Sequence, residues 1–170
     1  MASGTRCFED IQAIMRGLRD SPAILAGFVR EIPEDVLHRK RGEGFWSIAE
    51  HVVHLAAVQP MLAERLRRIL TEDMPEFVPF IPSEEDARSK PPMPGMEEAL
   101  SDFAAGRERI VEILNAAMPE DWDRLAAHPE YDCYGLRILA RHILMHDHWH
   151  MFRMEELWLT RDAFLTRLEG

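Results

Sequence analysis

A segment near the C-terminal end of the chain combines a helical apolar repeat with a row of histidines. Its apolar residues recur at three- and four-residue steps from Leu136 to Leu159, which predicts one amphipathic helix. Within this segment, His142, His146 and His150 stand four residues apart. Residues at this spacing lie one above the other on the same face of a helix. The sequence therefore predicts a stripe of imidazoles, and two such rings can hold one divalent ion.

The rest of the chain shows the same helical spacing and little else. No window alternates apolar and polar residues between turn signals, as a strand would. The chain is therefore expected to be all-α, a bundle of four main helices in a single domain spanning residues 1–170. Apolar residues at helical steps predict helices at 6–19, 23–30, 48–71, 96–118, 136–159 and 161–168.

Prolines mark the expected breaks between and within these helices. Ser21 is a good N-cap and Pro22 a good first helical residue, so the first helix is expected to restart there, as a second helix or after a kink. Pro60 predicts a kink in its helix because the proline ring does not fit the usual helical backbone. Residues 73–95 contain six prolines and predict a long loop between the second and third main helices. A second loop is expected at 119–134.

Composition limits the possible partners. The 170 residues, 46% of them hydrophobic, suffice for one core. A net charge of -10 excludes a nucleic-acid partner, because binding a phosphate backbone requires a basic surface. The two cysteines, Cys7 and Cys133, are too few for a disulfide scaffold and indicate reduced thiols in a cytoplasmic protein. No signal-peptide pattern and no run of roughly 18 apolar residues is present, so no membrane partner is expected.

A second pair of histidines lies about ninety residues upstream of the first group. His51 and His54 stand on the predicted helix 48–71, whose start is indicated by Ser47 and, three residues later, Glu50, the pattern of a capping box. Facing helices of a bundle can supply ligands to one site between them. The two histidine-bearing helices therefore predict a metal site inside the bundle.

Two stretches resemble the motifs of a known family. Residues 46–55, WSIAEHVVHL, resemble the W-S-x-x-E-x-x-x-H-L signature of the DinB/YfiT-like superfamily of metalloenzymes. Residues 146–150, HDHWH, resemble its second signature, H-[DE]-x-x-H. The likeness covers about residues 6 to 160. Three further features are placed as in such proteins: Ser21-Pro22, Arg107 and His128-Pro129-Glu130.

This resemblance implies a four-helix bundle of up-down-down-up topology that binds one divalent ion, often nickel or zinc. Matched residue by residue, its ligands are His54, His146 and His150. Three neutral imidazoles leave at least one coordination position open, which is the pattern of a catalytic rather than a structural ion. Three nitrogens alone do not distinguish zinc or nickel from iron or manganese.

Two residues near the predicted ligands are candidates for binding a substrate. Arg153 stands where the family often has glutamine, and is expected either to bind a substrate carboxylate or to pair with Glu50 or Glu156. Gln59 is expected either to donate a hydrogen bond to metal-bound water or to be a polar residue ahead of Pro60.

The remaining polar residues near the stripe have weaker assignments. His142 and His51 each lie one turn before a predicted ligand, so each is a possible fourth ligand, and His142 can instead line the entrance of a substrate pocket. His148 points away from the stripe and is expected at the surface or an interface. Asp147 is a candidate hydrogen-bond acceptor for an imidazole N–H.

Three classes of function fit these features. The first is a metal-dependent enzyme acting on a small molecule, for which the resemblance implies thiol transfer with a low-molecular-weight thiol, thiol-dependent isomerisation or hydrolysis. The second is a non-catalytic metal-binding stress-response or small-molecule-binding protein. A zincin-type metalloprotease fits poorly, because Asp147 is shorter than the usual glutamate and only 20 residues follow His150. No motif supplies a separate catalytic residue, so the ion must carry any chemistry.

The last long helix also predicts self-association. Family members are often dimeric, and Trp149, Phe152 and Trp158 make this helix apolar over more than one buried stripe. We expect a two-fold homodimer in which each subunit keeps its own metal site.

Overall fold

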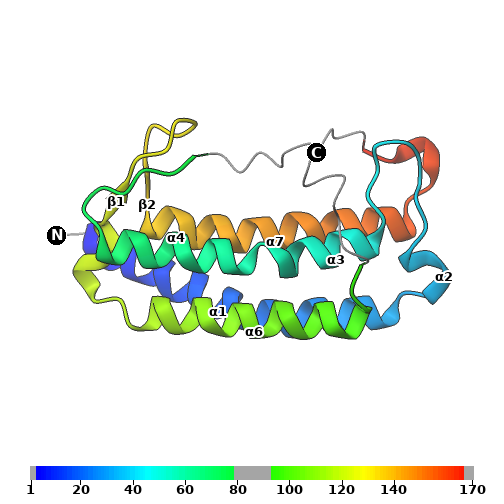
Figure 1. Cartoon of the computed structure of the whole chain (residues 1–170), viewed down its shortest axis with the longest axis horizontal. Helices are drawn as coiled ribbons and strands as arrows, with labels where there is room; N and C mark the ends of the chain where they lie inside the picture. Colours follow the sequence, from blue (N-terminus) through cyan, green and yellow to red (C-terminus); the bar gives the residue numbers. More distant parts are fainter. Residues whose placement is uncertain (1–2, 79–92, 167–170) are drawn as a thin grey trace.

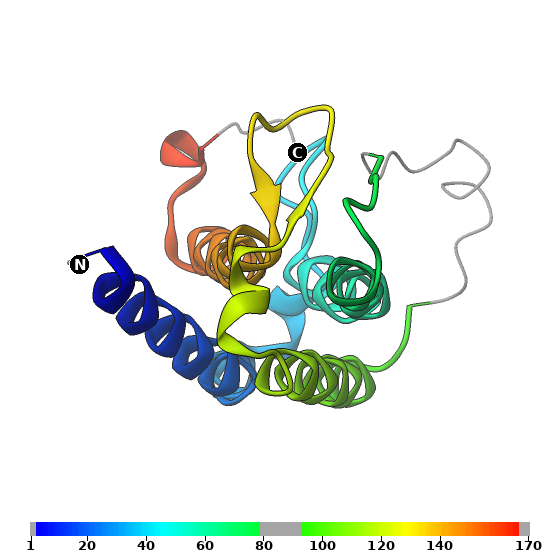
Figure 2. The ribbon, with the colours of Figure 1, turned by 90° about the vertical axis from the view of Figure 1, so that its left-hand side faces the viewer.

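The computed structural model describes residues 3–78 and 93–166, with side chains from residue 10 onward. Four helical rods lie side by side in a bundle (Figures 1 and 2). This architecture confirms the predicted all-α four-helix bundle. The rods are α1 (Ser3–Glu31), α3 with α4 (Ile48–Ala57 and Gln59–Thr71), α6 (Met96–Asn115) and α7 (Leu136–Leu159).

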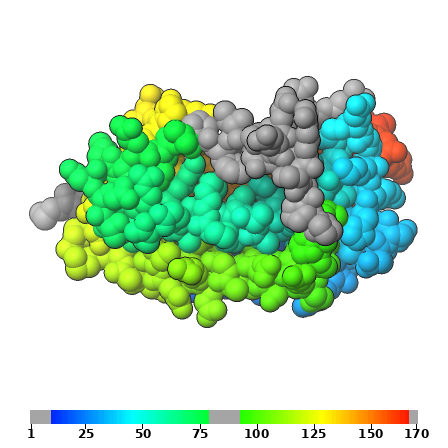
Figure 3. Space-filling view, in the orientation of Figure 1, coloured from blue at the N-terminus to red at the C-terminus, as the bar shows by residue number. Residues whose placement is uncertain are grey.

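The direction of the rods explains why a long connection is needed. α1 and α7 run one way along the bundle, and α3–α4 and α6 run the other way, which is the up-down-down-up order (Figure 1). Because α4 and α6 are parallel, the chain must travel the length of the bundle between them. In the space-filling view, α3 and α4 lie directly on α6 (Figure 3). Most of the predicted proline-rich loop, residues 79–92, lies outside the described residues.

A second helix starting at Ser21, one of the two expected alternatives, is wrong. α1 continues through it as one helix with Pro22 inside. Ser21 is buried, and its hydroxyl donates a hydrogen bond to Asp147 on α7 (2.7 Å) instead of capping a helix. A contact with a residue 126 positions away therefore overrides the local capping signal.

The helix predicted at 48–71 is divided as its proline suggests. α3 ends at Ala57 and α4 begins at Gln59, with Pro60 in its first turn. The capping box at the start of α3 is present, because Ser47 Oγ accepts from the backbone N–H of Glu50 (3.2 Å) and Glu50 Oε2 accepts from that of Ser47 (2.7 Å).

Several short elements depart from the sequence expectations. α6 ends three residues earlier than predicted, and a 3₁₀ turn at Asp162–Phe164 replaces the final helix within the described residues. The connection before α3 contains a four-residue helix, α2 (Glu34–Leu37). The loop 119–134 contains a 3₁₀ turn at Pro119–Asp123, and its end forms a small hairpin of β1 (Leu125–Ala126) and β2 (Tyr134–Gly135). Strands of two residues are too short to produce an alternating pattern.

The core consists of two apolar clusters separated by a polar layer. One cluster fills the end of the bundle near the hairpin, and the other fills the end near α2. At the level between them, the rods contribute one buried polar side chain each: Ser21, Gln59, Arg107 and Asp147. The histidine segment of α7 crosses the same level. No helix of the described residues is long and apolar enough to span a membrane.

Candidate metal centre

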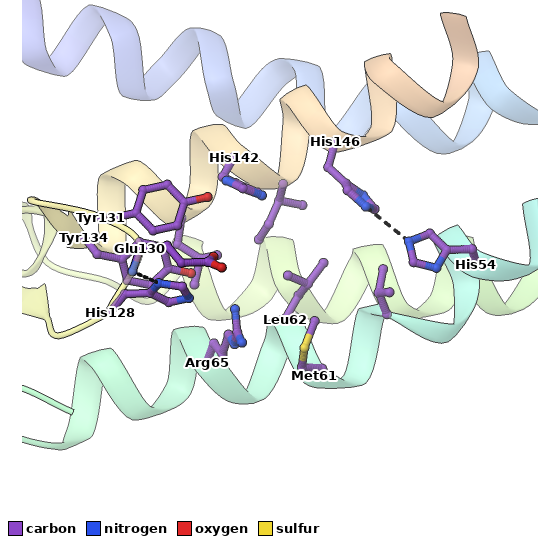
Figure 4. A pocket seen from close by; sticks show the side chains of 13 residues that line it. His54, Met61, Leu62, Arg65, His128, Glu130, Tyr131, Tyr134, His142 and His146 are labelled. Carbon is purple, nitrogen blue, oxygen red and sulfur yellow. Dashed lines mark hydrogen bonds between the residues drawn. The ribbon is translucent and has the colours of Figure 1, made fainter. Parts of the chain in front are cut away.

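Three histidines from two helices meet at one point. His54 comes from α3, and His146 and His150 come from successive turns of α7. The Nε2 atom of His146 lies 3.3 Å from Nε2 of His54 and 3.2 Å from Nε2 of His150. Figure 4 shows the rings of His54 and His146 facing each other across the space between the helices. The predicted convergence of these residues, about ninety positions apart, is confirmed.

This spacing fits one divalent ion. Two nitrogens held at about 2.1 Å from an ion, at angles between tetrahedral and octahedral, lie about 3.0 to 3.4 Å apart. The measured separations of 3.2 and 3.3 Å fall in this range. Without a cation, Nε2 of His146 can share a proton with the Nε2 atom of only one neighbouring histidine. The Nε2 atom of the other neighbour then has no proton to accept. A cation can accept all three lone pairs.

The electrostatic surroundings keep these rings in the form that binds metal. Burial lowers the pKa of His146 to about 4 and that of His150 to about 2, and it lowers the pKa of His54 as well. All three are therefore neutral at neutral pH, and neutral imidazole is the ligand form. The buried Nδ1 of His146 has no hydrogen-bond partner among the described residues.

His51 contacts the back of the cluster. Its Nδ1 lies 2.7 Å from Nδ1 of His150, and both rings are buried. If Nε2 of His150 offers its lone pair to an ion, Nδ1 carries the proton and donates it to His51. Such a hydrogen bond fixes the tautomer and the orientation of a ligand. His51 does not belong to the group of converging nitrogens, so its geometry fits an orienting partner and not a fourth ligand.

Two tryptophans pack against the histidines. The ring centroid of Trp46 lies 5.1 Å from that of His54 and 6.1 Å from that of His150, with which it stacks. Trp149 meets His150 edge-on, with centroids 4.7 Å apart. Trp46 remains 41% exposed, so it forms a cover that is itself open to solvent.

Two cavities meet at the cluster, and His54 and His146 line both. One cavity, of about 280 Å³, lies under the tryptophans and is also lined by Phe45, His150 and Arg153. The other, of about 330 Å³, extends along α4 and α7 toward the hairpin (Figure 4). An ion at the cluster is therefore approachable from two sides.

Arg153 lies in the wall of the smaller cavity, but its charge is already matched. The guanidinium is buried and pairs with the carboxylate of Glu156, which also accepts from the backbone N–H of Thr166 (2.7 Å). The alternative partner, Glu50, pairs with Lys40 (2.9 Å). The ion-pair interpretation with Glu156 is thus confirmed, and carboxylate binding by Arg153 stays a prediction.

The assignment of Gln59 to the metal site is wrong. Its amide N–H₂ donates to the carbonyl of Leu55 (2.8 Å), and its carbonyl accepts from Nε of Arg107 (3.3 Å). Both ends are therefore used in the polar layer, and Gln59 lines neither cavity at the histidines. The alternative, a structural polar residue ahead of Pro60, is the one observed.

Asp147 faces the polar layer and not an imidazole, so the prediction of an acceptor for a histidine N–H is also wrong. Both of its oxygens are bound by the guanidinium of Arg107, with Nη2 to Oδ1 at 2.9 Å, and Ser21 donates to Oδ2. Asp147 and Arg107 are each 1% exposed. A carboxylate held in this way cannot serve as the base of a zincin-type protease, which removes that alternative.

The remaining predicted residues lie as follows. His142 lines the larger cavity, one turn from His146, and is not part of the converging group. His148 is exposed, as predicted. Sequence reasoning missed Arg65, which lines the larger cavity together with the loop after β1. Its only sequence signal is its position on α4, three turns beyond His54.

Comparisons with known proteins agree with this fold and this cluster. Residues 18–154 match the family model of the DinB superfamily, and the chain belongs to that superfamily. A relative from Geobacillus thermodenitrificans (strain NG80-2), named "Putative metal-dependent hydrolase", is 33% identical over 121 residues, which are 69% of this chain and 66% of the relative. This chain thus matches slightly less than two thirds of that relative's length.

A solved structure shares the fold. It is that of YfiT from Bacillus subtilis, described as a probable metal-dependent hydrolase with an unusual four-helix bundle topology. It superposes with a TM-score of 0.74 at 22% identity, covering 86% of this chain and 85% of that one.

Proposed function

We propose that this protein is a metal-dependent enzyme that acts on a small molecule. The observation that carries the proposal is the convergence of three Nε2 atoms at 3.2 and 3.3 Å, at a point where two cavities meet. Metal-dependent hydrolysis is the activity for which its relatives are named. A divalent ion at this point supplies a Lewis acid, which polarises a carbonyl or lowers the pKa of a bound water or thiol.

The protein's own residues supply the position and the shape. His54, His146 and His150 stay neutral because they are buried, and His51 orients His150 through the Nδ1–Nδ1 contact. Trp46 and Trp149 restrict the access of water on one side. Within the described residues the cluster includes no carboxylate, so a proton released during the reaction must leave through solvent or a histidine outside the cluster.

Thiol-dependent transfer or isomerisation is the second candidate, and the presence of two cavities favours it. Hydrolysis needs one substrate and water. Transfer needs a low-molecular-weight thiol and an electrophile in contact with the same centre, and the two approaches to His54 and His146 can admit one each. Imidazole nitrogens suit zinc and nickel, with iron and manganese as alternatives.

The test starts from metal content and ends with turnover. The purified protein should retain one equivalent of a divalent ion, and it should turn over small esters or amides, or conjugate an electrophile when a thiol is added. Turnover should vanish on chelation and return with the metal. His54→Ala should abolish both properties, whereas His148→Ala, which changes an exposed ring, should preserve them. A bound ion without any turnover would favour the non-catalytic alternative.

Self-association is a separate proposal about the same helix. Met145, Trp149, Phe152 and Leu159 are exposed and recur along one side of α7 at the spacing of a helix seam. A second copy related by a two-fold axis would cover this stripe. Light scattering at micromolar concentration should give twice the mass of the chain, and Phe152→Glu should give the monomer. A wild-type monomer would remove this proposal.

A further inference from the structure

The larger cavity beside the histidine cluster changes character along its length. At the cluster end it is lined by His54 and His146, and apolar side chains of α4 and α7 follow. Its far end gathers polar groups from three parts of the chain (Figure 4). These are Arg65 of α4, His142 of α7, His128, Glu130 and Tyr131 of the loop between β1 and β2, and Tyr134 of β2.

Arg65 is the fixed positive charge of this end. Its Nη2 donates to the backbone carbonyl of Val78 (2.8 Å), and the guanidinium lies 5.4 Å from the ring centroid of Phe77. In the described part of the chain, no carboxylate lies within ion-pair distance of it. One helical turn further on, Arg68 is paired with Glu72 at 2.9 Å. Among the described residues, the charge of Arg65 thus has no ion-pair partner.

Two neutral hydrogen-bond donors, His128 and Tyr134, line the same cavity as Arg65. The Nδ1 atom of His128 accepts from the backbone N–H of Glu130 (3.3 Å), so its proton is on Nε2, which makes that nitrogen a donor. Burial raises the pKa of Tyr134, which therefore stays a neutral phenol. The rings of His128, Tyr131 and Tyr134 lie 4.9 to 5.3 Å apart and form an aromatic wall. A guanidinium with neutral donors beside it matches the chemistry of a carboxylate.

We propose that this cavity binds the carboxylate end of the substrate, with Arg65 as its anion-binding residue. The reacting end of the molecule then lies at His54 and His146, so this inference rests on the proposed function. Arg65 takes the role that the sequence suggested for Arg153, whose charge is matched by Glu156. Binding energy at a remote group of this kind serves to position the reacting atoms.

Glu130 provides a second test of the proposed carboxylate site, with an effect opposite to that of Arg65. It lines the same cavity and is exposed, so it adds a negative charge near the site where the carboxylate binds. Replacing Glu130 with Gln should therefore tighten the binding of a carboxylate, whereas replacing Arg65 with Gln should weaken it. Opposite responses of two residues in one wall distinguish specific anion binding from general damage to the cavity.

The experiment uses the cobalt(II)-loaded protein and a series of ω-mercaptocarboxylates, from 3-mercaptopropionate to 6-mercaptohexanoate. Their thiol binds the ion and changes its visible spectrum, which reports affinity without turnover. Each acid is compared with the mercaptoalcohol of equal length. At one chain length the acid should bind about tenfold more tightly than the alcohol, in line with a charge-assisted hydrogen bond. Arg65→Gln should remove this preference.

Arg67→Gln is the matched control, because Arg67 is an exposed arginine of the same helix that pairs with Glu64 and does not line this cavity. It should keep the preference, and Glu130→Gln should increase it. Equal affinity of acids and alcohols at every length would overturn the inference. So would a preference that survives Arg65→Gln and is lost in Arg153→Gln, because the carboxylate would then lie in the other cavity.

Failure of the proposed function would look different. A protein that takes up no divalent ion would contradict the metal site itself. The Arg65 site is then tested with benzoate and the metal-free protein by calorimetry. Binding that Arg65→Gln abolishes and Arg67→Gln preserves would support the anion site alone, and no binding to the wild type would overturn it.

Discussion

His146 and Asp147 are neighbours in the sequence and belong to polar clusters of opposite kinds. Asp147 points into the centre of the bundle, where Arg107 and Ser21 satisfy both of its oxygens. His146 points toward α3, where its Nε2 meets two other ring nitrogens and its Nδ1 has no partner among the described residues. One cluster is closed and complete, and the other is open to two cavities.

The contrast separates a structural from a functional use of buried polar groups. Removing one partner from a complete buried network is strongly destabilising, because the other partner is left charged, buried and unpaired. An incomplete cluster at a cavity is retained for what it binds. The closed cluster also holds α7 in the rotation that turns His146 and His150 toward α3. Its packing is tight: a Cβ added at Gly106 would lie 2.5 Å from Cβ of Gln59.

The largest expected effect is on the closed cluster. Asp147→Ala leaves Arg107 charged and unpaired at 1% exposure. Loss of one partner of a buried pair costs about 3 to 5 kcal/mol of the free energy of unfolding. Chemical denaturation followed by circular dichroism measures it. Glu64→Gln, which breaks an exposed pair with Arg67, is the control and should leave stability unchanged. A small loss in Asp147→Ala would mean that the two clusters do not differ in kind.

A substitution in the open cluster should weaken metal binding and leave the fold intact. His146→Ala should lower metal affinity by about 100-fold or more, since it removes a ligand and leaves two. The helical circular dichroism of the metal-free variant should stay close to that of the wild type, because the apolar clusters remain intact. Metal content after dialysis against a chelator gives the affinity. Retention of the ion by His146→Ala would contradict the assignment of the ligands.

His51 should have a smaller effect on the same property. As an orienting partner of His150, its replacement by Ala should weaken metal binding by about 10- to 100-fold without abolishing it. His148→Ala, on the exposed side of α7, serves as the control and should bind the metal normally. A loss as large as that of His146→Ala would instead indicate that His51 is itself a ligand.

The pH dependence of the metal-free protein should show the smallest effect. The pKa of His51 and of His146 is lowered from 6.5 to about 4, and that of His150 to about 2, all three chiefly by burial. The unfolded chain therefore binds protons below about pH 6.5 that the folded chain does not, so the stability falls as the pH falls from about 6.5 to about 4.

These rings border open cavities, where solvent weakens the effect of burial. The free energy of unfolding of the metal-free protein should therefore fall by only about 1 kcal/mol in total between pH 7 and pH 6. Urea unfolding at the two pH values measures it. This loss of stability should be smaller in His146→Ala, which has one buried histidine fewer. A stability that rises as the pH falls through this range would show that the histidines are stabilised in their charged form, contrary to a buried neutral cluster.

Local patterns predicted the parts of the site that lie on one element. Spacing of four residues placed His146 and His150 on one face of α7, and Ser47 with Glu50 marked the start of α3, because helical geometry repeats every 3.6 residues. The resemblance to the DinB/YfiT-like motifs added His54 as the third ligand. The helical spacing of apolar residues also predicted the four rods, because each rod buries one apolar stripe.

Contacts between elements decided the rest, and no local pattern encodes them. Gln59 was a candidate donor to metal-bound water, with a structural polar role as its alternative, and Asp147 was a candidate acceptor for an imidazole N–H, because both stand near the histidines in sequence. Each instead completes the polar layer with Arg107, which lies 48 and 40 residues away from them. Ser21 has the sequence of a cap but donates to Asp147 from within a continuous helix.

The sequence by itself determined that this chain forms helices, where most of them begin, and that two of them carry histidines on one face. Those properties depend on residues within a few turns of one another. The tertiary structure alone decided which nitrogen of each ring faces the cluster and that His51 contacts His150 through Nδ1. It also decided that Arg153 is paired with Glu156, whereas Arg65 lines its cavity without an ion-pair partner among the described residues. These contacts depend on how the packed helices are rotated about their axes and how far apart they lie. Helical periodicity within one segment does not determine either quantity.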